Sequence, residues 1–157
     1  MLAALSWRTV VLVLAASTAA NVGTRADPYK LGALVRADGF AVHVVSVDRS
    51  ATPGDRKPKA GRSDVLVTMQ ATNRSKFEGI PFVDGALGAV DTAGFTYSSL
   101  AQSCGAIAGD VTTLNPVRPG ATVTVHTCWQ VANFDVKSLV MYYAPYDGSR
   151  ETYFALR

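Results

Sequence analysis

Alternation of apolar and polar residues in short runs is the feature that most constrains how this chain folds. From Leu31 onward, Gly, Pro, Asp and Ser interrupt these runs, and no apolar repeat of helical spacing persists for the length of a helix. Alternation with a period of two is typical of half-buried β-strands, whose side chains point to opposite faces in turn. The sequence therefore predicts an all-β protein.

Turn signals divide the alternating runs into strands. Residues 91–94 (DTAG) and 146–149 (YDGS) place Asp and Gly where tight hairpins require them. Seven or eight strands at this spacing predict a two-sheet antiparallel sandwich. The predicted strands cover residues 31–36, 39–48, 64–73, 86–91, 95–99, 121–131, 138–143 and 151–156.

Alternation also assigns side chains to faces. In the predicted strand 121–131, Trp129 shares the apolar side, which we expect to face the core, whereas His126 and Cys128 project from the opposite side. In the last predicted strand, Phe154 and Leu156 are expected in the core. Cys128 is thereby placed where a crossing loop can reach it.

The N-terminal stretch has the layout of a secretory signal peptide. Arg8 precedes an apolar run over about residues 9–20, and small residues lead to Ala26. The run is too short for a membrane span, which takes about 20 residues. We expect removal of residues 1–26 on export, with an earlier cut in the Ala/Ser/Thr tract as the alternative. No cysteine stands near this region to take a lipid anchor.

Charge and length limit the class of protein further. Residues 27–157 carry thirteen cationic and twelve acidic side chains, a net charge of +1. The cations are scattered or confined to one loop, unlike the concentrated basic surface of a nucleic-acid binder. A chain of this length buries roughly two thirds of its unfolded surface as one domain. We expect one secreted, monomeric domain over residues 27–157, with no nucleic-acid partner and no transmembrane segment.

The sequence contains two cysteines, Cys104 and Cys128. In an exported chain two cysteines most often pair, because the compartment is oxidising. Such a bond closes a loop of about 25 residues, and loop-closure entropy gives it roughly 3.5 kcal/mol of stabilisation. We therefore predict a disulfide between Cys104 and Cys128 that ties down the strand-poor segment between them.

A thiol nucleophile is the alternative use of Cys128. His126 shares its strand face and could serve as a base, but no glycine-rich nucleophile turn and no third orienting group are visible. His43 and His126 are the only histidines, and they lack the spacing of zinc ligands. We expect no catalytic residue, no metal and no cofactor.

Two groups of residues are candidate contact surfaces. Residues 49–63 combine turn formers with mixed charge and predict a long exposed loop, in which Arg56, Lys57 and Lys59 could contact an envelope polyanion or lipid head group. A solvated loop with no partner is the alternative. The C-terminal hairpin is rich in tyrosine, and we take Tyr143 and Tyr153 as possible exposed contacts, although cross-strand packing explains such tyrosines equally well.

Several segments of residues 31–156 carry a family resemblance. They are LGALVRADGFAVHVVSV, DVLVTMQATNRS, AVDTAGFTY with its Asp-x-x-Gly hairpin, LNPVRPGATVTVHTCWQV and SLVMYYAP. The chain resembles a family of telokin-like, immunoglobulin-like domains of unknown function in secreted Gram-positive proteins, actinobacterial ones especially. It is distantly similar to a mycobacterial secreted immunogenic protein. The resemblance implies an immunoglobulin-like sandwich and supplies no catalytic signature.

These observations favour a secreted, non-enzymatic binding or interaction protein of the extracellular space or cell envelope. Its partner is an extracellular protein or envelope component that the sequence does not identify. The alternatives are a passive envelope or antigenic protein and an envelope hydrolase or thiol enzyme. Fold alone does not choose among them.

Export and pairing of the cysteines are tested together by the intact mass of protein recovered from culture medium. We expect a mass that begins at Asp27, lacks the hydrogens of both thiols, and changes with an alkylating agent only after reduction. An uncleaved chain whose two cysteines react freely without reductant would contradict both predictions.

Overall fold

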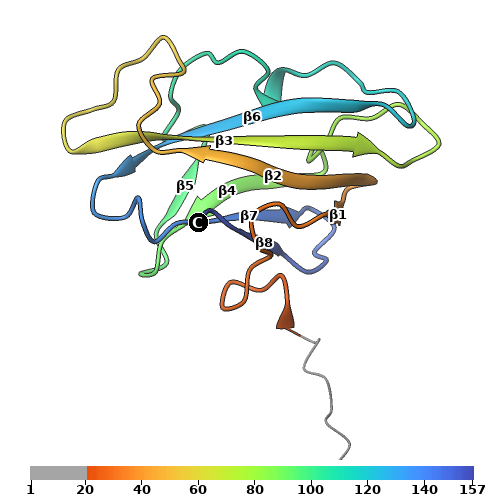
Figure 1. Cartoon of the computed structure of the whole chain (residues 1–157), viewed down its shortest axis with the longest axis horizontal. Coiled ribbons are helices and arrows are strands. Elements are labelled where there is room, and N and C mark those ends of the chain that lie inside the picture. The colour runs from red at the N-terminus through yellow and green to blue at the C-terminus, as the bar shows by residue number, and fades with distance from the viewer. Residues whose placement is uncertain (1–20) are drawn as a thin grey trace, which may run out of the picture.

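Eight strands build the part of the chain that the structure describes, residues 21–157 of a computed structural model (Figure 1). The apolar run of the expected signal peptide lies outside the described residues. The elements are β1 (Val35–Ala37), β2 (Phe40–Asp48), β3 (Arg62–Asn73), β4 (Gly85–Val90), β5 (Thr96–Ser98), the 3-10 helix η2 (Val111–Thr113), β6 (Thr122–Ala132), β7 (Val140–Pro145) and β8 (Thr152–Ala155).

The strands form two layers of four (Figure 1). One sheet has the order β1-β2-β3-β6 and the other has the order β5-β4-β7-β8. Every strand pairing within the two sheets is antiparallel. This arrangement confirms the all-β, two-sheet antiparallel sandwich that the alternation predicted. No helix among residues 21–157 is long and apolar enough to cross a membrane.

The core lies between the inner faces of the two sheets. Trp129 of β6 and Met69 of β3 contribute from one sheet, and Met141 of β7 and Phe154 from the other, all of them buried. Leu156, just after β8, is buried as well. The faces expected for Trp129, Phe154 and Leu156 are therefore confirmed. Burial of apolar side chains is the main favourable term for such a fold, at about 25 cal/mol per Å².

The first strand differs most from its prediction. A strand was predicted over residues 31–36, but β1 covers Val35–Ala37. Gly32 has a φ of +79°, a left-handed conformation that belongs to a turn, and its N–H donates to Val44 O. The apolar pattern was misleading here because Leu34 is exposed rather than part of the core.

The segment before β1 lies along the edge strand β8. Tyr29 forms a parallel bridge with Phe154, and the Tyr153 N–H donates to Gly23 O at 2.9 Å. Covering an edge strand removes unpaired backbone groups that would otherwise attract another chain. Cleavage after Ala26 would remove the Gly23 contact, whereas a cut within the earlier Ala/Ser/Thr tract would keep it.

Candidate functional site

Two loops cover the outer face of the β1-β2-β3-β6 sheet, the face turned away from the core. They are the loop over residues 49–61, between β2 and β3, and the segment over residues 99–113, between β5 and β6 (Figure 1). Beneath them, Asp64 of β3 faces Gln130 of β6 in the strand register. The outer face at this point is therefore buried by loops and not by a second layer of strands.

The disulfide between Cys104 and Cys128 attaches the 99–113 segment to β6, as predicted. The Cα atoms lie 5.8 Å apart, and both residues are buried. On either side of the bond the segment is paired with β6 through its backbone, because the Gln130 N–H donates to Gln102 O and the His126 N–H donates to Gly109 O, both at 2.8 Å. The segment thus covers the edge of β6 that β3 does not pair.

Two glycines allow the loops to pack against each other over the disulfide. A Cβ on Gly54 would lie 2.0 Å from Cys104 O, and a Cβ on Gly105 would lie 2.0 Å from the Asp55 carboxylate. Gly105 also has a φ of +91°, which other residues adopt only with strain. The Asp55 carboxylate accepts a hydrogen bond from the Ala106 N–H at 2.9 Å, which joins the two loops.

A concavity of about 150 Å³ lies where the two loops meet. Gln130, which is buried, fixes its base: the side-chain amide donates to Lys57 O at 3.2 Å and accepts from the Lys59 N–H at 3.4 Å. Arg62 donates from Nη1 to Gln130 O at 3.0 Å. The lining residues are Arg56, Lys57, Lys59, Arg62, Ala101, Gln102, Ser103 and Gln130.

The concavity is strongly cationic. Within residues 21–157 the only ion pair joins Arg118 to Glu78, so none of the four lining cations has a carboxylate within salt-bridge distance. The nearby Asp55 is held by the Ala106 N–H of the other loop. Four like charges around one polar hollow attract an anion, most strongly at low ionic strength.

The structure thus brings together the basic residues that the sequence singled out. Arg56, Lys57 and Lys59 are exposed and line one hollow. Sequence reasoning missed Gln130 and the residues 101–103, which supply the base and the opposite wall. The one signal that pointed to this wall was Cys104, because a disulfide to Cys128 brings its neighbours to β6.

The tyrosine surface requires a correction. Tyr143 is 3% exposed and packs against Phe82 with ring centroids 5.1 Å apart, so it belongs to the core and not to a contact surface. Burial raises the pKa of Tyr143 to about 12. On the outer face, the half-buried Tyr153 lies opposite Tyr142, with ring centroids 6.1 Å apart. Alternation placed Tyr142 and Tyr143 on opposite faces but did not say which of the two pointed inward.

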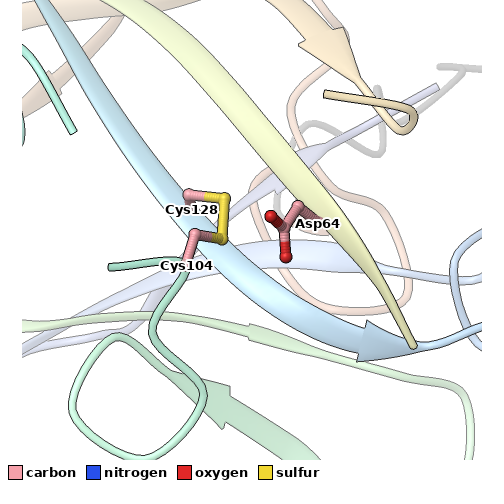
Figure 2. Close-up of side chains that lie close together, drawn as sticks. All are labelled: Asp64, Cys104 and Cys128. Atoms are coloured by element: carbon pink, nitrogen blue, oxygen red, sulfur yellow. A yellow bond between two sulfur atoms is a disulfide. The ribbon is translucent and has the colours of Figure 1, made fainter. Parts of the chain in front are cut away.

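Asp64 is a buried carboxyl beside the disulfide (Figure 2). Neither of its oxygens has a hydrogen-bond partner, although Gln130 lies opposite Asp64 in the strand register. Burial raises the pKa of Asp64, and the nearby Gln130 amide opposes this rise. The sequence placed Asp64 at the start of the predicted strand 64–73 and did not indicate that it would be buried.

Neither a metal site nor a thiol nucleophile is assembled at the disulfide. Asp64, Cys104 and Cys128 have ligand atoms within 4.8 Å of one another, but both sulfurs are shared in the disulfide and are not available as thiolate ligands. The Nδ1 atom of His126 lies 3.2 Å from the Thr68 hydroxyl. The pairing of Cys128 therefore removes the nucleophile that the thiol-enzyme alternative required.

The fold places the chain in the class of two-sheet β-sandwich proteins, and comparison with solved structures agrees. An uncharacterized β-sandwich protein from Clostridium difficile 630 superposes with a TM-score of 0.56 at 14% identity, over 83% of this chain and 95% of that chain. The yjhA protein from Bacillus subtilis gives a TM-score of 0.56 at 13% identity, over 82% of this chain and 99% of that one.

A conserved hypothetical protein from Bacillus anthracis has a TM-score of 0.51 at 14% identity, over 80% of this chain and 94% of that chain. No known family profile and no curated protein sequence matches the chain. At these identities the likeness extends to the fold alone.

The buried Asp64 makes stability depend on pH in a specific direction. Its raised pKa means that the folded protein holds the proton more tightly than the unfolded chain, so stability falls as pH rises from about 4, the ordinary Asp pKa. We expect Asp64→Asn to raise the melting temperature relative to the wild type by an amount that grows from acidic to neutral pH. Melting curves across this range measure it.

Asp147→Asn is the control, because the Ser149 N–H lowers the pKa of the exposed Asp147 carboxyl. Relative to the wild type, the melting temperature of this variant should fall as pH rises toward neutral, which is the opposite direction to Asp64→Asn. A difference between Asp64→Asn and the wild type that stays constant with pH would contradict the account of Asp64.

Proposed function

We propose that this protein is an exported, non-enzymatic binding protein that takes an anionic group of an envelope component in the concavity between its two outer loops. The observation that carries the proposal is the set of four cations, Arg56, Lys57, Lys59 and Arg62, that line one polar hollow with no carboxylate in salt-bridge distance. Phosphate or carboxylate groups fit such a site, because guanidinium and ammonium groups bind them by charge-assisted hydrogen bonds.

The fixed backbone of the site favours binding over a solvated loop. A solvated basic loop needs no internal partner, whereas Gln130 holds the backbone at Lys57 and Lys59, and Asp55 joins the loop to Ala106. Preorganisation of this kind lowers the entropy that is lost when a ligand binds. The cations are therefore presented on a fixed frame, as in a binding site.

Export supports the same reading. The signal-peptide layout of residues 1–26 and the disulfide both fit an oxidising, extracellular compartment. The resemblance to telokin-like domains of secreted Gram-positive proteins points in the same direction. We propose a monomer at the cell envelope, where anionic polymers and lipid head groups are abundant.

Neutralising the exposed cations tests the site. We expect the combined variant Arg56→Gln, Lys57→Gln, Lys59→Gln to bind tripolyphosphate about tenfold more weakly or worse, since each exposed charge pair contributes up to about 1 kcal/mol. Titration calorimetry at about 0.01 M and about 0.15 M salt should also show wild-type affinity falling with salt.

The matched control is Lys30→Gln, Arg74→Gln, Lys76→Gln, which removes the same residue types from exposed positions outside the concavity. This variant should keep most of the wild-type affinity, since only the net charge is changed. Equal losses in the two variants, or no binding by the wild type at low salt, would sink the proposal and favour a passive envelope protein.

A further inference from the structure

An apolar groove lies close to the cationic concavity and shares a segment of chain with it. The groove has a volume of about 360 Å³ and is lined by residues of 80–87 together with Leu100, Val111 and Tyr146. Leu100 is 97% exposed, and Val83 and Tyr146 are also exposed. Large apolar side chains at the rim of one hollow are characteristic of a site that binds apolar material.

Residues 98–103 connect the groove to the concavity. Ser98, Ser99 and Leu100 line the apolar groove, and the next three residues, 101–103, line the cationic concavity. A third hollow of about 220 Å³ shares Ser103 with the concavity and shares Ser99, Leu100 and Thr112 with the groove. The third hollow therefore adjoins both of the others, and the series runs from a cationic end to an apolar end.

The middle hollow is compatible with a ligand that crosses it. Ala106 and Ile107 contribute apolar surface there. Its carboxylate, Asp110, already accepts hydrogen bonds from the Thr112 N–H at 2.7 Å and from the Thr112 hydroxyl at 2.6 Å. Hydrogen bonds within the protein thus partly satisfy the Asp110 carboxylate. The four cations line the concavity, which lies at the opposite end from the apolar groove.

We infer that the ligand of this protein is a single anionic amphiphile, with its phosphate or carboxylate head in the cationic concavity and its acyl chain along residues 98–103 into the apolar groove. The inference rests on the proposed function for the head-group site and adds the class of ligand. Charge complementarity selects the anionic head, and the continuity of the three hollows selects one molecule that carries both parts.

The test compares three soluble probes below their micelle concentrations: dihexanoyl phosphatidic acid, glycerol phosphate and dihexanoyl phosphatidylcholine. The first carries both parts, the second only the anionic head, and the third the same chains with a zwitterionic head. We expect phosphatidic acid to bind more than about tenfold tighter than glycerol phosphate, because each buried methylene adds to affinity. Phosphatidylcholine should bind more weakly than phosphatidic acid by about the same factor.

Variants separate the two ends of the site. Leu100→Asp places a carboxylate at the rim of the groove without disturbing the core, because Leu100 is almost fully exposed. It should abolish the gain from the acyl chains, measured as the ratio of the affinities for phosphatidic acid and glycerol phosphate, because both probes carry the anionic head and are affected alike by the added charge. Phe134→Asp, at another highly exposed apolar residue that lines none of these hollows, should leave this ratio unchanged.

The outcomes distinguish this inference from the proposed function. Equal affinity for phosphatidic acid and glycerol phosphate, or a gain that survives Leu100→Asp, overturns the inference while tripolyphosphate binding still supports the head-group site. Equal affinity for phosphatidic acid and phosphatidylcholine also overturns it, because the cations would then take no part. If the wild-type protein does not bind tripolyphosphate at low salt, the proposed function itself is overturned.

Discussion

The disulfide between Cys104 and Cys128 is the constraint on which the rest of the candidate site depends. It attaches a segment poor in strand formers to β6, and loop-closure entropy gives a bond over this span roughly 3.5 kcal/mol. That stabilisation is large beside the total of about 5–15 kcal/mol for a domain. Because the segment is fixed, Ala106 can bond to Asp55, and the loop that carries the basic residues acquires a partner.

The electrostatics of the outer face follow from this packing. The loops exclude water from Asp64, which raises the pKa of its carboxyl, while they leave Arg56, Lys57 and Lys59 exposed around the concavity. A carboxyl that is buried without partners costs stability. Functional sites often retain such costs, and here the carboxyl lies opposite Gln130, which lines the cationic concavity.

The alternation of residues was enough to predict the fold, since a period of two assigns both strands and faces, as for Trp129 and Phe154. Pairing of the cysteines followed from their number and from the expectation that the chain is exported. The site was only half predictable. Arg56, Lys57 and Lys59 can be recognised in the sequence by their charge. Residues 101–103 cannot, because they join the site only through the packing of one loop against the other. Tyr143 was misjudged because adjacent tyrosines fit either face equally well.

The central claim, that the disulfide shapes the cationic concavity, is tested most directly by comparing tripolyphosphate binding to the native protein and to the variant Cys104→Ser, Cys128→Ser. A circular dichroism spectrum first establishes that the variant retains its sheets. The account predicts that the variant keeps the sandwich but binds several-fold more weakly, since the loop that opposes the basic residues is released. Equal affinity in the two proteins would contradict it and would make the basic loop independent of the disulfide.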